Sequence, residues 1–207
     1  FCIRNDELEW CKTVFRDVLE KDPNKATWDI VLQWAAGVMG KGVEDVERMM
    51  KVMIRRSASA NGTDSIEPDI VTINGLVELA MSLNNSYLAE RYIALGEKFG
   101  IKPNANTFIL QMKYRADAND LRGAQEAYDL LQAEEVQNDE DLPAINIFLR
   151  ALCASKNDHY TRIVSITSDL EERNKRLEAD TVCALTTMYL QRDELDDLID
   201  VLQTQSY

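Results

Sequence analysis

Apolar residues recur along most of the chain with the spacing of amphipathic helices. Trp28, Val31 and Ala35 form one such stripe, because residues three or four positions apart share a helix face. Only 8 Gly and 4 Pro interrupt the chain, so the composition favours helices joined by short turns. The pattern predicts helices over residues 6–21, 25–39, 43–56, 70–83, 86–99, 105–117, 120–134, 143–155, 159–174, 181–191 and 194–204.

The predicted helices come in pairs that are too small to bury their apolar faces alone. Each pair must then pack against the next, which predicts an all-α fold, a right-handed superhelical α-solenoid of stacked antiparallel helix pairs over residues 1–207. A non-repetitive helical bundle is the alternative. On the last helix, the side chains predicted to face inward are Leu195, Leu198, Ile199 and Leu202, with acids on the opposite side.

The chain repeats itself in one stretch. The segment Ile66–Gly75 recurs thirty-five positions later as Ile101–Leu110. At that offset the matching pairs are Pro68 with Pro103, Thr72 with Thr107, Asn84 with Asn119, and Ala89 with Ala124. Matches at a fixed offset indicate a repeat array. The predicted units are the second helix of a preceding repeat at 1–22, repeats at 24–56, 69–103, 104–140, 141–178 and 179–207, and a flexible insertion at 57–66.

A unit of thirty-five residues that closes with Gly100-Ile-Lys-Pro-Asn104 resembles the pentatricopeptide repeat family. Ile66-Glu-Pro-Asp69 is similar to the same closing segment, and the Trp, Leu-Gly and Tyr pattern of tetratricopeptide repeats is not visible. The resemblance is strongest over residues 66–136, and elsewhere it rests on periodicity. Such irregular units resemble the divergent mitochondrial members of the family, in particular those of fungi. The chain begins at Phe1 without an initiator Met, so a fragment or a processed form of a longer protein is expected.

The resemblance implies that each repeat reads one RNA base. The readers would be the fifth residue of the first helix and the last residue of the unit. Carried onto this sequence, they are Asn74 with Asn104, and Asn146 with Asp180. Ile109 occupies the fifth position of another unit and cannot hydrogen-bond to a base edge. The alternative for the Asn side chains is an exposed helix face without a ligand.

RNA binding also requires basic groups that neutralise phosphates. The candidates on first helices are Lys113, Arg115 and Arg150, with Lys156 in the following turn. Their alternative is a solvated surface. The formal net charge of −13 has the wrong sign for gripping phosphates. The acidic clusters at 134–141 and 193–200 suit a basic protein partner, or they keep the surface soluble.

The sequence carries little sign of a catalytic or metal site. Its four Cys residues lack a Cys-x-x-Cys spacing, so no zinc site or other cofactor is expected. Cys11, Cys153 and Cys183 fall on apolar helix faces, where burial is expected. His159 has no Ser or Cys partner in register, so we expect no nucleophilic dyad and no enzyme. No apolar run is long enough for a membrane span.

The segment Ser57–Ser65 is small and polar, which predicts a mobile surface loop. A regulatory, phosphorylated loop is the alternative, because the segment contains several Ser and Thr residues.

Two functional hypotheses follow. The first is an RNA-binding adaptor of mitochondrial gene expression, located in the matrix, that engages single-stranded organellar RNA in transcript stability, processing or translation. The family resemblance carries this hypothesis. The second is a protein-binding scaffold, such as a respiratory-complex assembly factor or a mitoribosome-associated protein, that reads no bases. The negative charge and the units that depart from the family pattern favour the second hypothesis.

Overall fold

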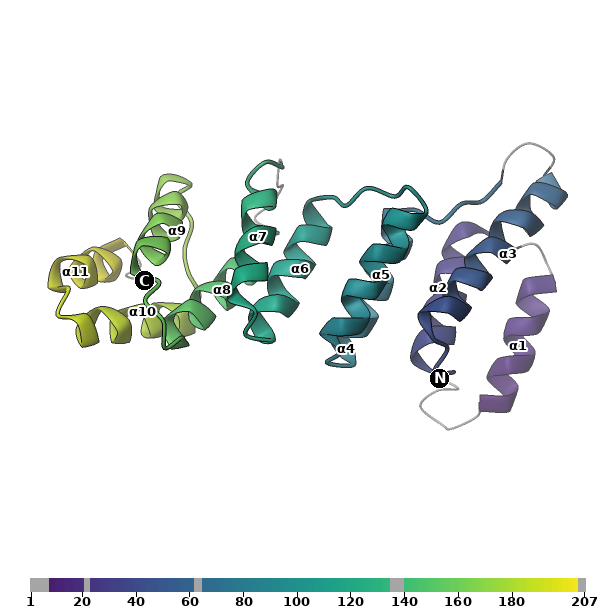
Figure 1. The fold of residues 1–207 in the computed structure, drawn as a ribbon, viewed down its shortest axis with the longest axis horizontal. Coiled ribbons are helices and arrows are strands. Elements are labelled where there is room, and N and C mark those ends of the chain that lie inside the picture. Colours follow the sequence, from purple (N-terminus) through teal and green to yellow (C-terminus); the bar gives the residue numbers. More distant parts are fainter. Residues whose placement is uncertain (1–7, 21–22, 62–64, 135–139, 205–207) are drawn as a thin grey trace. The chain divides into compact units, whose positions relative to one another are not determined.

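The computed structural model describes residues 8–20, 23–61, 65–134 and 140–204. Over these residues the chain forms eleven α-helices and no strand, which confirms the predicted all-α class (Figure 1). The chain divides into two compact units, Phe1–Pro103 and Asn104–Tyr207. Each unit is described by itself below.

Unit 1 contains five helices. They are α1 (Leu8–Glu20), α2 (Lys25–Gly37), α3 (Val43–Asn61), α4 (Ile70–Ser82) and α5 (Ser86–Lys98). Helix α2 packs against α3 and α4, and α5 packs against α3 and α4. First helices therefore contact first helices, and second helices contact second helices, as expected for stacked pairs. The fully buried side chains between them include Leu32, Met50, Met53, Leu76 and Tyr92.

Unit 2 contains six helices. They are α6 (Ala105–Asp117), α7 (Leu121–Leu131), α8 (Leu142–Ala154), α9 (Tyr160–Glu172), α10 (Ala179–Arg192) and α11 (Leu195–Thr204). The first helices again stack in order, α6 on α8 and α8 on α10. One core cluster joins the unit and includes Met112, Leu131, Phe148, Leu149 and Tyr189. This packing is that of a helical repeat, while the right-handed superhelix stays a prediction.

Repeated local chemistry sets the helix ends. Asp69 and Asn104 each cap a first helix, and in both cases a Thr three residues later completes a capping box. Asn84 and Asn119 end the same two helices with φ values of 51° and 60°. Asn tolerates this left-handed conformation better than most residues do. The thirty-five-residue recurrence in the sequence is thus a recurrence of caps.

The structure differs from the predicted loop at residues 57–66. Helix α3 continues to Asn61, and Ser57 is buried, with 6% of its surface exposed. The Ser57 hydroxyl donates to the Met53 carbonyl at 2.9 Å and accepts from the Ile66 amide at 2.7 Å. This pair of bonds satisfies Ser57 within the helix and fastens the returning chain. Residues 62–64 lie outside the described residues.

Two burial predictions for unit 2 are wrong. Cys183 is exposed, whereas Cys153 is partly buried and burial raises the pKa of its thiol to about 11. The side chains of Cys2 and Cys11 lie outside the described ones. On α11, only Val201 is buried, and Leu198 is partly buried. The exposed fractions of Leu195, Ile199 and Leu202 are 52%, 48% and 50%. Helix α11 packs mainly against α10, and one neighbour covers only one face.

Candidate interaction surface on the first helices

In unit 1, the fifth residue of α2 contacts the beginning of α4. The Thr72 hydroxyl donates to Asp29 Oδ1 at 2.6 Å. Lys25 Nζ lies 2.8 Å from Asp29 Oδ2 and 2.8 Å from Asp69 Oδ1. Asp69 is also the N-cap of α4, where its carboxylate accepts the amides of Val71 and Thr72. One lysine therefore bridges the fifth position of one first helix and the cap of the next.

The charges at this junction stabilise one another. Burial alone would lower the pKa of Lys25, but the hydrogen bonds and charges of Asp29 and Asp69 raise it above its ordinary value. Burial alone would raise the pKa of Asp69, but the bonds from Lys25 and from the Thr72 amide lower it. The lysine and this carboxylate are therefore both charged near neutral pH, and their charges are already partnered.

In unit 2, the fifth residue of α8 makes the equivalent contact with α10. Asn146 Nδ2 donates to the Leu142 carbonyl at 2.8 Å, and Asn146 Oδ1 accepts from the Glu178 amide at 3.0 Å. Arg150 donates to Glu178 Oε2 at 2.7 Å and to the Thr181 hydroxyl at 3.0 Å. Glu178 is the N-cap of α10. Asn146 and Thr181, at the centre of this junction, are 2% and 0% exposed, whereas the side chains of Arg150 and Glu178 are 32% and 51% exposed.

The junction between α6 and α8 has a third chemistry. Ile109, the fifth residue of α6, is 8% exposed, and it packs in the unit 2 core with Ala144 and Ile145 of α8. The N-cap of α8, Asp141, is 1% exposed and makes no side-chain cap bond. Instead Asp141 Oδ2 lies 2.8 Å from Arg173 Nη2, which comes from the end of α9.

The predicted base-reading residues take different places in this arrangement. Asn146 accepts a hydrogen bond from the Glu178 amide, and Asp180 is an exposed residue in the first turn of α10. Asn74 is 5% exposed on α4 of unit 1. Asn104 caps α6 in unit 2 and accepts the Thr107 amide at 3.1 Å. Base reading by these four residues stays a prediction.

The predicted phosphate contacts are also partly engaged within the protein. Arg115 donates to the Gly123 carbonyl at 3.0 Å, and Arg150 pairs with Glu178 as described above. Lys113 is partly buried on α6 and makes no ion pair with the described residues. Lys113 is therefore a cation without a carboxylate partner in the described part of the chain.

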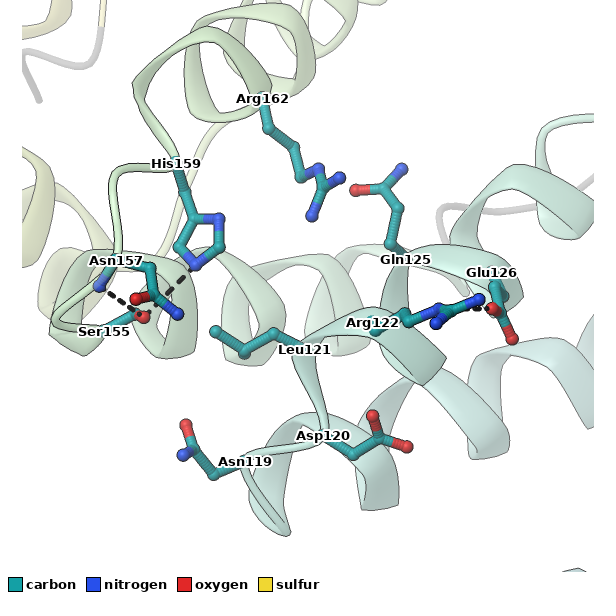
Figure 2. A pocket seen from close by; sticks show the side chains of 10 residues that line it. All are labelled: Asn119, Asp120, Leu121, Arg122, Gln125, Glu126, Ser155, Asn157, His159 and Arg162. Atoms are coloured by element: carbon teal, nitrogen blue, oxygen red, sulfur yellow. Dashed lines mark hydrogen bonds and ion pairs between the residues drawn. The ribbon is translucent and has the colours of Figure 1, made fainter.

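A hollow of about 530 Å³ opens beside the turn between α8 and α9 (Figure 2). Arg162 extends into it between His159 and Gln125, while Arg122 turns aside to Glu126, with Nε and Oε1 3.2 Å apart. Neither Arg162 nor Gln125 was among the predicted site residues. A pattern search could not find them, because the hollow joins α7 to a turn more than thirty residues later.

The turn beside this hollow corrects the expectation for His159. His159 Nε2 lies 3.2 Å from the Ser155 hydroxyl, so the histidine does have a Ser partner, at the i−4 position. The Ser155 hydroxyl also accepts the Asn157 amide at 3.2 Å. Hydrogen bonds from the Tyr160 amide and Arg192 lower the pKa of Asp158, whose carboxylate bonds to Arg192 rather than to the histidine. The Ser155 contacts close the turn, and no carboxylate among the described residues orients the imidazole as a triad requires.

The described ranges contain no group of three or more His, Cys, Asp or Glu side chains placed to hold a metal ion. None of the helices in these ranges has the length and apolar character needed to cross a bilayer.

No protein-family model matches the sequence. The chain is similar to "Complex I intermediate-associated protein 84, mitochondrial" of Neurospora crassa, with 38% identity over 201 residues, or 96% of the chain. The chain spans 25% of the length of that protein. The similarity is thus nearly complete along this chain and covers about a quarter of a mitochondrial protein named for its association with a complex I intermediate.

Proposed function

We propose that this chain is a protein-binding segment of a helical-repeat scaffold that acts in the assembly of mitochondrial respiratory complex I. The observation that carries the proposal is the 38% identity to the complex I intermediate-associated protein over 96% of the chain. Because the similarity runs through both units, the segment is expected to keep the fold of its relative and the type of partner that this fold holds. The relative's name places it in mitochondria, so we propose the same compartment, with the matrix as the finer location.

Two observations, one from the sequence and one from the structure, support protein binding over RNA binding. The net charge of −13 opposes binding to a phosphate backbone. The fifth-position side chains Asp29 and Asn146 bond to the next first helix within their own units, which engages groups that would otherwise face a base. A scaffold uses its surface in protein contacts and needs no such readers.

We further propose that the helix pairs are pentatricopeptide-like units, stacked in a right-handed superhelix, with no catalytic role. Capping boxes at Asp69 and Asn104 and left-handed turns at Asn84 and Asn119 support this proposal, because they recur at the repeat length. An experimental structure of the chain tests this proposal about the helix pairs. A left-handed or closed arrangement of the pairs would contradict it.

Disruption of the gene in the organism that encodes the protein tests the proposed function. Native gel electrophoresis of mitochondrial membranes should show a loss of complete complex I and an accumulation of its intermediates, with the other respiratory complexes unchanged. The tagged protein should migrate with one of those intermediates. Normal levels of complete complex I in the disrupted strain would overturn the proposal.

A control separates an assembly role from RNA binding. If complex I is lost because one mitochondrial transcript is absent or untranslated, pulse labelling of mitochondrial translation products will show one missing subunit. The proposed function expects all of these products to be present. Titration of the chain with single-stranded RNA at several salt concentrations tests the alternative directly, because binding through phosphates weakens steeply with salt.

A further inference from the structure

Helix α11 presents a stripe of three large apolar side chains to the outside of unit 2. Leu195, Ile199 and Leu202 are 52%, 48% and 50% exposed. Their spacing of four and three residues places them on one face, because each residue advances about 100° around a helix. Val201, at 4% exposure, lies on a different face and anchors α11 to the core. The stripe is thus additional to the surface that holds α11 in place.

Part of this register is buried on two earlier second helices, α3 and α7. The stripe occupies the first, fifth and eighth positions of α11. In α3 the first and eighth positions are Val43 and Met50, which are 6% and 0% exposed, and α3 packs against α5. In α7 the eighth position is Tyr128, at 7% exposure. An apolar side chain at the first position of α3, or at the eighth position of α3 and α7, is thus buried, whereas the fifth positions, Glu47 and Gln125, are polar and partly exposed.

The charges beside the stripe indicate what kind of neighbour it fits. Asp196 and Asp200 are exposed and lie about 100° and 140° around the helix from Leu195. Neither makes an ion pair within the described part of the chain. Asp197 accepts the Tyr160 hydroxyl, so it is engaged inside the unit. The sequence of α11 contains no Lys or Arg. The stripe is consequently bordered by uncompensated negative charge.

We propose that the stripe of Leu195, Ile199 and Leu202 is a docking site for an amphipathic α-helix of a partner protein whose apolar face is bordered by Lys or Arg. Burying three half-exposed aliphatic side chains supplies the attraction, and the aspartates select a basic helix over an acidic one. A second copy of the chain fits less well, because pairing α11 with itself would bring the aspartates of two helices together. The inference rests on the proposed protein-binding function and names the chemistry of the partner.

The test uses a fluorescent, designed helical peptide of Leu and Lys, with Leu at three-and-four spacing, titrated against the full chain by anisotropy. Saturable binding is expected, and hydrogen exchange should slow in α11. The variant Leu195→Ser/Ile199→Ser/Leu202→Ser should bind at least about tenfold more weakly. The matched control Tyr87→Ser/Leu130→Ser changes exposed apolar residues elsewhere, at 74% and 52% exposure, and should bind like the wild type. Circular dichroism should show equal helix content in all three proteins.

Charge is tested with two further arms. A peptide with Glu in place of Lys should not bind. The variant Asp196→Asn/Asp200→Asn should bind the Lys peptide about threefold to tenfold more weakly at low salt. Equal weakening in the stripe variant and in the matched control would overturn the proposal in favour of non-specific association. Absence of binding to the Lys peptide would also overturn it.

Two other occupants of the stripe are distinguished by separate measurements. Sedimentation that shows a concentration-dependent dimer, abolished by the stripe variant, would assign the face to a second copy. Resistance of an Ile199→Cys side chain to thiol labelling in the unbound full-length protein would show that the protein already covers the stripe itself. Either result overturns the proposal.

The proposed function and the docking site can fail separately. If the stripe variant still migrates with a complex I intermediate in mitochondria, the docking site is wrong and the assembly role stands. If the wild-type protein migrates with no intermediate, the assembly role is wrong, and the peptide titration still decides the chemistry of α11.

Discussion

The junctions between α2 and α4 and between α8 and α10 solve the same packing problem with different chemistry. In both, the fifth residue of a first helix bonds to the first turn or cap of the next first helix. In unit 1 the bridge is ionic and partly open to solvent, since the side chains of Lys25 and Asp69 are 31% and 49% exposed. In unit 2 the central group is the neutral amide of Asn146, which is 2% exposed.

The comparison shows that the stacking of first helices fixes where the fifth-position residues lie. The identity of each residue decides how much its contact contributes to the free energy of unfolding. Leaving a buried hydrogen-bonding group without its partner costs more free energy than removing an exposed ion pair. We therefore expect the unit 2 junction to be the stronger one, although it carries less charge. Substitutions at equivalent positions test this difference.

The largest effect is expected for Asn146→Ala, which leaves the Glu178 amide and the Leu142 carbonyl without their side-chain partner. The free energy of unfolding of unit 2 should fall by about 2–3 kcal/mol. Urea unfolding, together with hydrogen exchange of the α8 and α10 amides, measures the change. Asn106→Ala is the matched control, because Asn106 is exposed on α6 of the same unit, and its effect should stay within about 0.5 kcal/mol. Equal effects of the two variants would remove the distinction between the junctions.

A smaller effect is expected for Asp29→Ala, the equivalent change in unit 1. The Thr72 hydroxyl and Lys25 lose one acceptor, but Asp69 remains beside both. The free energy of unfolding of unit 1 should fall by about 1–1.5 kcal/mol. Asp29→Asn keeps an acceptor for Thr72 and should recover about half of the loss, as measured by the same urea titration. A loss larger than that of Asn146→Ala would reverse the order of the two junctions.

The sequence was sufficient for features that depend on local chemistry. The recurrence of Asp69 as Asn104 and of Asn84 as Asn119 is visible in the sequence, and the structure shows that these residues cap or end the first helices through contacts a few positions apart. The all-α class followed from these elements. The inward orientation of Leu195 and Ile199 on α11 was wrong, because a stripe shows which residues share a face and not whether a neighbour covers it.

Features that join distant segments could not be read from the pattern. Ser57 was predicted to begin a polar loop, but it is a buried residue of α3 whose hydroxyl accepts the Ile66 amide. Helix α10 begins at Ala179, with Glu178 as its cap, two residues before the predicted start at 181, because small shifts of register do not change an apolar stripe. The pairing of Asn146 with the next helix depends on that register.

A third prediction compares the two cations. Lys25→Met and Arg150→Met remove the basic member of each junction while keeping the apolar stem. Each should lower the free energy of unfolding of its unit by about 0.5–1 kcal/mol at low salt. Added salt should diminish the two effects alike, because the carboxylate partners Asp69 and Glu178 are 49% and 51% exposed. Each cation also donates to a buried threonine hydroxyl, Lys25 to Thr72 and Arg150 to Thr181. Salt sensitivity in only one of the two variants, measured by urea unfolding, would contradict this equivalence.

The smallest expected effect is the pH dependence of the unit 1 junction. It tests whether Lys25 and Asp69 stabilise this junction as an ion pair. The folded pKa of Asp69 lies below its ordinary value of 3.8, so the stabilisation by the pair is present above that value and is lost as the pH falls through the folded pKa. The pKa of Lys25 is raised above 10.5, so its contribution is present below that value and is lost as the pH rises through the folded pKa.

The difference in stability between the wild type and Lys25→Met should accordingly be constant from about pH 5 to pH 9 and should shrink at both extremes. NMR titration of the Asp69 carboxyl in Lys25→Met should show its pKa moving up towards 3.8. The variant Lys25→Met/Asp69→Asn is the control, because it lacks both charges and should show no further pH dependence from this pair. If the wild type and Lys25→Met lost stability in parallel down to about pH 2, Lys25 would act only through its packed stem, and the two junctions would differ in burial rather than in charge.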